Sequence, residues 1–254
     1  MYDLALVGIA SGSPDHLTAE ARRALSEADV ILIPQKGAEK AELAGVRTAL
    51  LGDLGAAPRA VPFEMPVRDE AEPDYLQRVE DWHDRIAGIW ADALMGALPR
   101  GGKAAMMIWG DPSLYDSSLR IAERLPGRGI EVAVRVIPGI TSLQLLTAAH
   151  GIPLNDLGAP VLITTGRRLR EGWPPGVERL VVMLDGSCSF TQLPEPERYR
   201  IWWGAYLGMA GEILRAGRLD KVAEDIVARR AAARADRGWI MDVYLLERRG
   251  EVAA

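Results

Sequence analysis

Residues 103–115, KAAMMIWGDPSLY, decide the fold. The run 103–109 is small and apolar apart from its first residue and lies between glycines, which is typical of a parallel strand buried on both faces. The polar loop 110–115 follows this strand directly. Open α/β sheets bind ligands beyond the carboxyl ends of their strands. The segment therefore predicts a buried strand that leads into a binding loop.

The same alternation of strand-like and helix-like segments continues on both sides of this stretch. Strands or extended segments are predicted at 4–9, 30–33, 61–66, 132–137, 161–165, 180–184, 201–207 and 239–246. Helices are predicted at 18–28, 39–51, 74–98, 117–125, 141–150, 211–216 and 219–230. This order is typical of an α/β protein. We place the boundary of two α/β domains after Leu114, which gives domains of residues 1–114 and 115–254.

Composition excludes several classes of protein. The 254 residues are 48% hydrophobic and 26% charged, as in ordinary globular chains. The single cysteine, Cys188, allows no intrachain disulfide, and the three separated histidines give no metal-binding signature, so no metal is predicted. A net charge of −5 argues against a nucleic-acid partner. The uncharged run 136–155 contains turn formers and polar residues, so we expect no membrane span, no targeting segment and a cytoplasmic location.

Two further glycine-containing turns are candidate binding loops. Residues 7–18, VGIASGSPDHLT, would allow close approach of a ligand to the backbone, although their spacing matches neither a dinucleotide fingerprint nor a P-loop. Residues 136–142, VIPGITS, place Thr141 and Ser142 at a helix start, which suits a polar or anionic ligand. A tight turn and a helix cap explain these two segments about as well.

Isolated polar residues give weaker signals. Arg167 and Arg168 could bind carboxylates, although a solvated loop is the commoner explanation. His83 borders the apolar stripe of the 74–98 helix, where a packed histidine is commoner than a catalytic one, but its ordinary pKa keeps a general-base role open. In the loop 110–115, Gly110 permits close backbone approach and Asp111 can accept hydrogen bonds, while an ordinary Asp-Pro turn is the alternative.

The order and spacing of these motifs resembles the tetrapyrrole methylases, the class III S-adenosylmethionine (SAM) methyltransferases, over essentially the whole chain. The resemblance implies two α/β domains with an active-site cleft between them, SAM as co-substrate leaving as S-adenosylhomocysteine, and a homodimer. Carried over by matching position, the SAM contacts would be Ser11, Gly110, Asp111, Leu114, Thr141, Ser142, Gly186 and Leu207. The chain departs from the family pattern at Ala10, where glycine is usual, and at Asp185, where many relatives have methionine.

Within this family, segments 36–40, 66–69, 81–83, 109–117 and 203–208 are most similar to members that methylate precorrin-5 at C-1 in aerobic cobalamin synthesis and release acetate. That reaction implies a base that activates water, and His83 and Asp111 are the candidates. A polycarboxylate tetrapyrrole substrate implies arginine clamps at Arg68, Arg120, Arg167 and Arg168. The alternatives are a sister methyltransferase acting on C-11 or C-17, a more distant relative that methylates RNA or a protein histidine, and a non-catalytic binder of SAM or tetrapyrrole.

Overall fold

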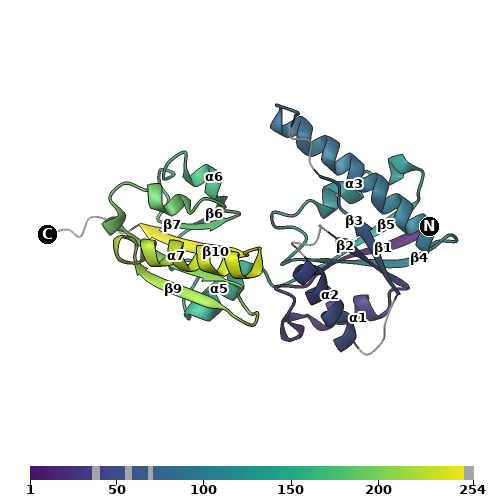
Figure 1. Cartoon of the computed structure of the whole chain (residues 1–254), viewed down its shortest axis with the longest axis horizontal. Coiled ribbons are helices and arrows are strands. Elements are labelled where there is room, and N and C mark those ends of the chain that lie inside the picture. Colours follow the sequence, from purple (N-terminus) through teal and green to yellow (C-terminus); the bar gives the residue numbers. More distant parts are fainter. Residues whose placement is uncertain (36–40, 55–58, 68–70, 249–254) are drawn as a thin grey trace. The chain divides into compact units, whose positions relative to one another are not determined.

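The computed structural model describes residues 1–35, 41–54, 59–67 and 71–248, and it divides into two compact units, Met1–Thr141 and Ser142–Ala254 (Figure 1). Each unit has its own five-stranded sheet. The predicted boundary after Leu114 differs from this division, because the strand Val132–Ile137 pairs with the first strand of the chain and so belongs to the first unit.

The first unit contains a fully parallel sheet in the order β3-β2-β4-β1-β5. Its strands are β1 (Tyr2–Gly8), β2 (Val30–Gln35), β3 (Arg59–Glu64), β4 (Gly102–Ile108) and β5 (Val132–Ile137). The helices are α1 (Ala19–Ser26), α2 (Ala41–Asp53), α3 (Tyr75–Ala97) and α4 (Ser118–Ala122), with short 3-10 turns at Pro14–His16 and Pro126–Arg128. Because every strand runs in the same direction, all the loops at their carboxyl ends emerge at one edge of the sheet.

Alternation along β1 divides the core of this unit into two layers. Leu4 and Leu6 pack on the face that α3 covers, whereas Ala5 and Val7 pack on the face that α1 and α2 cover (Figure 1). Thr18 caps the start of α1, because the Ala21 N–H donates to Thr18 Oγ1 at 3.0 Å.

The second unit contains a mixed sheet in the order β6-β7-β10-β8-β9. Its strands are β6 (Val161–Thr165), β7 (Arg179–Met183), β8 (Tyr199–Ala205), β9 (Ile213–Arg218) and β10 (Asp242–Arg248). The helices are α5 (Ser142–His150), α6 (Gly166–Leu169) and α7 (Leu219–Arg237), with 3-10 turns at Ser189–Gln192 and Pro196–Arg198. Strand β10 is antiparallel to both β7 and β8, and β6 is parallel to β7, so β6, β7 and β8 all end at the same edge.

One predicted element is wrong in type. Residues 211–216 were expected to be helical, but Ile213–Arg218 form β9, which pairs antiparallel with β8. The leucine, arginine and alanine of this segment favour a helix locally, and the hydrogen bonds to β8 override that preference. Each of the other predicted strands and helices overlaps an observed element. In the described part of the chain, no helix combines the length and the apolar character needed to cross a bilayer.

Candidate functional site

Three glycines bring three loops into direct backbone contact at the carboxyl edge of the first sheet. Gly8 ends β1, Gly110 follows β4 and Gly139 follows β5. A Cβ added to Gly139 would lie 2.2 Å from the carbonyl oxygen of Gly110, and one added to Gly8 would lie 2.6 Å from the nitrogen of Gly139. No larger residue fits at Gly8 or Gly139 without displacing backbone. We call these three residues the glycine junction.

The loop after β1 is pinned to this junction by a short antiparallel bridge. The Gly110 N–H donates to the Ala10 carbonyl at 2.7 Å, and the Ala10 N–H donates back to the Gly110 carbonyl at 3.3 Å. Ala10 has φ +50°, a conformation that glycine adopts more readily, and this accounts for the usual glycine at that position. Ser11 follows the bridge, is 7% exposed, and has its Oγ 3.5 Å from His16 Nδ1.

Asp111 joins the loop after β4 to the turn after β5. Its Oδ1 accepts hydrogen bonds from the backbone N–H of Ser113 at 2.8 Å and from the Ser113 hydroxyl, and its Oδ2 accepts from the Gly139 N–H at 2.9 Å. Partial burial would raise the pKa of Asp111, but these hydrogen bonds outweigh it and hold the pKa below its usual value. Asp111 is therefore a stable carboxylate and a weak proton acceptor.

The junction is closed at Gly8 and Gly139 but open at Gly110. A Cβ added to Gly110 would meet only the Cα of Thr141, at 3.9 Å. Leu114 is partly buried in the same loop, and its N–H donates to the Asp111 carbonyl at 3.3 Å. The first unit thus gathers five of the predicted SAM-contact residues on loops that follow β1, β4 and β5: Ser11, Gly110, Asp111, Leu114 and Thr141.

The other three predicted SAM contacts belong to the second unit. Ser142 begins α5, Gly186 follows β7, and Leu207 follows β8. Gly186 is exposed, and a Cβ added there would have nothing within 4 Å. Leu207 is 5% exposed and packs closely on Gly204. A Cβ added to Gly204 would lie 2.5 Å from the Leu207 side chain.

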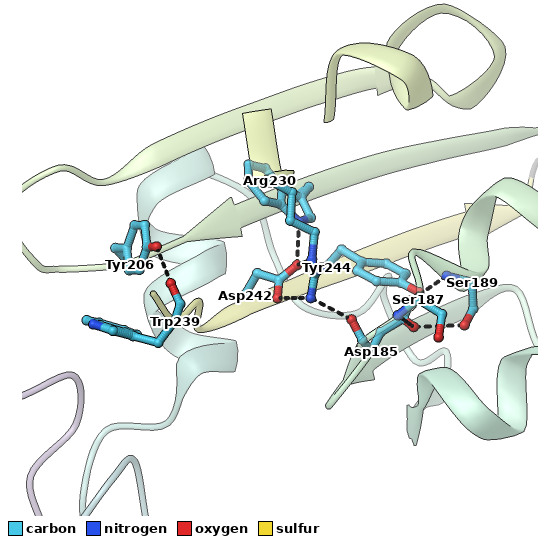
Figure 2. A network of polar contacts seen from close by, with 9 residues as sticks. Asp185, Ser187, Ser189, Tyr206, Arg230, Trp239, Asp242 and Tyr244 are labelled. Carbon is cyan, nitrogen blue, oxygen red and sulfur yellow. Dashed lines mark hydrogen bonds and ion pairs between the residues drawn. The ribbon is translucent and has the colours of Figure 1, made fainter. Parts of the chain in front are cut away.

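The loop after β7 is held by Asp185, a buried carboxylate that is 5% exposed (Figure 2). Its Oδ1 accepts from the Ser187 N–H at 3.1 Å and from the Ser189 hydroxyl at 2.8 Å. Its Oδ2 accepts from the Ser189 N–H and from the Tyr244 hydroxyl, both at 2.6 Å. Burial would raise the pKa of Asp185, but the hydrogen bonds, led by that of Tyr244, lower it below its usual value. Gly166 makes room for this carboxylate, because a Cβ there would lie 2.3 Å from Asp185 Oδ1.

An arginine extends this network to the neighbouring helix and strand. Arg230 of α7 donates to the Asp185 carbonyl at 3.0 Å and to Asp242 Oδ2 at 2.8 Å (Figure 2). Leu184 and Cys188, on either side of the network, both have positive φ. The sequence marked Asp185 as part of a strand-end Asp-Gly segment that could lie against a ligand or form an ordinary turn, and as a departure from the family pattern. It did not show the network, because the partners Tyr244 and Arg230 come from distant segments.

The predicted base His83 is buried in the first unit. It lies on α3, is 2% exposed, and has its ring centroid 5.7 Å from that of Trp82. The Trp82 indole N–H donates to the carbonyl of Pro66, just after β3, at 2.8 Å. This burial suits the packing role that the apolar stripe also allowed.

The predicted arginine clamps have different surroundings. Arg120 on α4 is exposed and donates to the Asp116 carbonyl at 3.3 Å. Arg167 and Arg168 are exposed in α6, at the edge where β6 ends, and Arg168 pairs with Glu171 at 2.8 Å. Arg68 lies outside the described residues, as does the segment 36–40. Across the described ranges, no group of three or more histidine, cysteine or acidic side chains is arranged to hold a metal ion.

Sequence reasoning missed Arg47, on α2. It is 7% exposed, its Nε donates to the Met107 carbonyl at 3.4 Å, and its guanidinium carbon lies 4.7 Å from the ring centroid of Trp109. Burial lowers the pKa of Arg47 to about 10, against the opposing charge of Asp116. A possible signal was its spacing, because Arg47 precedes buried Leu50 by three residues and so shares its helix face.

The fold and these loops define a two-unit α/β protein whose candidate binding residues lie at strand ends. The family model of the tetrapyrrole (corrin/porphyrin) methylases matches residues 3–223. The chain belongs to this family and is a methyltransferase. The predicted family, fold class and class of enzyme are confirmed.

Two proteins are similar to this chain over nearly its full length. The chain is 49% identical to a precorrin-6A synthase [deacetylating] from Sinorhizobium sp, over 98% of this chain and 96% of the relative. A crystal structure of a cobalamin synthesis related protein from Corynebacterium diphtheriae has a TM-score of 0.85 and 34% identity, and the match covers 98% of this chain and 100% of the other.

A more distant structure shares the fold. A uroporphyrin-III C-methyltransferase from Thermus thermophilus, complexed with S-adenosylhomocysteine, has a TM-score of 0.57 and 22% identity, with 96% of this chain and 97% of the other covered.

Proposed function

We propose that this methyltransferase transfers a methyl group from SAM to C-1 of precorrin-5 and releases acetate, giving precorrin-6A in the aerobic synthesis of cobalamin. The observation that carries the proposal is the 49% identity, over nearly the full length of both chains, to a precorrin-6A synthase [deacetylating]. Mass spectrometry of the product from precorrin-5 tests it. We expect the product to have gained a methyl group and lost the acetyl group, whereas a product that keeps the acetyl group would indicate a sister activity at another carbon.

The glycine junction supports SAM as the methyl donor. Neighbouring backbone fills the space beside Gly8 and Gly139 but leaves space beside Gly110. A ligand can therefore approach the peptide groups of Gly110 and Thr141 closely. We assign the SAM contacts to Ser11, Gly110, Asp111, Leu114 and Thr141 of the first unit and to Ser142, Gly186 and Leu207 of the second. When bound, SAM would supply an electrophilic methyl group on its sulfonium.

The proposed reaction consumes water. Water adds to the acetyl carbonyl, the bond between that carbon and C-1 breaks, acetate and two protons leave, and the electron pair stays on C-1. That pair then forms the bond to the methyl group, and S-adenosylhomocysteine leaves. The main contribution of the protein is to hold the reacting carbon in line with the methyl group.

We infer that neither predicted base performs the water activation in this conformation. Both oxygens of Asp111 already accept hydrogen bonds, and its pKa is lowered, so its role is to position the two loops. His83, at 2% exposed, is too deeply buried to reach a water on the substrate, which a general base must do.

We propose exposed arginines as the partners of the substrate carboxylates. Arg167 and Arg168 are adjacent at the edge where β6 ends, and Arg120 is exposed on α4. A guanidinium can bind a carboxylate through two parallel hydrogen bonds. Arg68 stays in this set on the family resemblance alone.

The family resemblance also leads us to propose a homodimer that acts in the cytoplasm. Strand β5 forms an edge of the first sheet and exposes Val134 and Val136, by 38% and 42%, which is compatible with burial against another chain. Light scattering after size-exclusion chromatography tests the dimer, and a monomer at micromolar concentration would contradict it.

A further inference from the structure

Three arginines are buried in the described part of the chain, and one of them differs from the other two. Arg179 is 9% exposed and pairs with Glu247 and Asp156, and Arg230 is 9% exposed and pairs with Asp242. Arg47 is 7% exposed, yet it forms no ion pair with any described residue. Buried charges are normally paired, because removing a charge from water is costly.

Arg47 lies beside the candidate binding loops. Its Nε bonds the carbonyl of Met107 on β4, and its guanidinium stacks over Trp109, the residue before Gly110. The loop after β1 packs beside the same tryptophan, because a Cβ added to Gly12 would lie 2.5 Å from Val46 and 3.0 Å from Trp109. One backbone carbonyl near the end of β4 and an aromatic face thus hold the guanidinium at the carboxyl edge of the sheet.

The neighbouring acid does not neutralise this cation. The charge of Asp116 acts on Arg47, but Asp116 Oδ1 accepts the Ser118 N–H at 2.7 Å, and its carboxylate lies beyond ion-pair distance of the guanidinium. Among the described residues, the hydrogen bond to Met107 is the one that Arg47 donates. No described residue accepts a hydrogen bond from the terminal nitrogens of the guanidinium, and their planar fork matches a carboxylate.

We propose that Arg47 binds a carboxylate of one of the two substrates, next to the loop that begins at Gly110. The proposal rests on the proposed function, in which both SAM and the tetrapyrrole carry carboxylates. A carboxylate that enters beside Trp109 would supply the ion pair that the described residues do not provide. The binding of that carboxylate would then depend on the charge of Arg47.

The test compares Arg47→Met and Arg47→Gln with the wild type. Methionine keeps an unbranched chain without charge, and glutamine keeps an N–H donor for the Met107 carbonyl. Arg23→Met, at an exposed arginine on α1, is the matched control. Calorimetry measures the binding of S-adenosylhomocysteine and of 5′-methylthioadenosine, which lacks the carboxylate, and kinetics give the KM for precorrin-5.

If Arg47 binds the carboxylate of SAM, both variants weaken the binding of S-adenosylhomocysteine by about tenfold or more. Their affinity for 5′-methylthioadenosine then stays within about twofold of the wild-type value. If it binds the tetrapyrrole, the KM for precorrin-5 rises by about tenfold or more while both nucleoside ligands bind as in the wild type. In either case the ligand-free variants unfold at the wild-type temperature or above it, because a buried charge that no described residue pairs with has been removed.

Two results would overturn the proposal. Equal losses for S-adenosylhomocysteine and 5′-methylthioadenosine would show that Arg47 only supports the loop, and unchanged values for all three ligands would show that it binds none of them. If the wild type itself fails to convert precorrin-5, the proposed function fails separately. Arg47 is then judged on the two nucleoside ligands alone, where unchanged affinity overturns the proposal.

Discussion

The Oδ2 atom of Asp111 accepts a hydrogen bond from the backbone N–H of Gly139 at 2.9 Å. This bond links the loop after β4 to the turn after β5, and the two loops also touch where the Gly110 carbonyl faces Gly139. One charged side chain thus fixes the relative position of two predicted SAM-binding segments.

Replacing Asp111 with alanine should loosen this link. The variant leaves the N–H groups of Ser113 and Gly139 without their acceptor, so we expect a loss of about 1–3 kcal/mol in the free energy of unfolding. Binding of S-adenosylhomocysteine should weaken as well. Urea unfolding and calorimetry measure the two effects, and Asp92→Ala, at an exposed acid on α3, is the control. Wild-type stability and affinity in Asp111→Ala would contradict a positioning role.

Alanine at Gly139 should disrupt the glycine junction itself. Its Cβ would lie 2.2 Å from the Gly110 carbonyl oxygen, so backbone must move. We expect a destabilisation of several kcal/mol, about the size of a severe overpacking defect, and loss of S-adenosylhomocysteine binding. Gly127→Ala is the matched control, because a Cβ there has nothing within 4 Å. Equal thermal stability of the two variants would show that the junction is looser than described.

Asp185→Asn should reduce stability in a pH-dependent way. The pKa of Asp185 is lowered in the folded state, so its carboxylate stabilises the fold fully above the ordinary pKa near 3.8, and this contribution is lost as the pH falls through the lowered value. Urea unfolding should therefore show a gap between wild type and variant of about 1–3 kcal/mol at pH 7 that narrows below about pH 4. A gap that stays constant down to pH 2 would contradict the assignment, and Asp236→Asn, on the exposed side of α7, is the control.

His83→Gln tests whether the buried imidazole is the base. If His83 only packs, the variant is less stable but, below its unfolding temperature, forms acetate and S-adenosylhomocysteine at about the wild-type rate. Assays for the two products measure this rate. A large fall in the rate of both products, with S-adenosylhomocysteine binding and the KM for precorrin-5 unchanged, would restore His83 as the base.

Replacing both Arg167 and Arg168 with glutamine should affect the tetrapyrrole alone. We expect the KM for precorrin-5 to rise by about tenfold, because one or two charge-assisted hydrogen bonds to the substrate are lost. The affinity for S-adenosylhomocysteine should stay unchanged. Arg198→Gln, at an arginine paired with Glu195 in a 3-10 turn, serves as control. An unchanged KM for the double variant would remove this pair from the substrate site.

Local sequence predicted the parts of the site that depend on local backbone. The loop that contains Gly110 and the turn that contains Gly139 follow buried strands, and parallel strands bring such loops to one edge. The pairing of strands that are far apart in the chain could not be predicted from local sequence in the same way. The placement of β5 beside β1 moved the unit boundary to Thr141, and pairing with β8 turned 213–218 into a strand.

Buried polar partners were equally hidden from local patterns. Asp185 is held by Tyr244, which is 59 residues away in sequence, and Arg47 meets Met107 across 60 residues. A helix or loop pattern shows that such a residue is charged, but only the tertiary fold shows what it contacts. These two residues therefore required the structure.

The most direct test of the central claim is the reaction of the wild-type chain with precorrin-5 and SAM carrying a 13C-labelled methyl group. Carbon NMR of the product locates the label, and parallel assays count acetate and S-adenosylhomocysteine. The account predicts the label at C-1, with one acetate released for each S-adenosylhomocysteine formed. A label at another carbon, or methyl transfer without acetate, would contradict it.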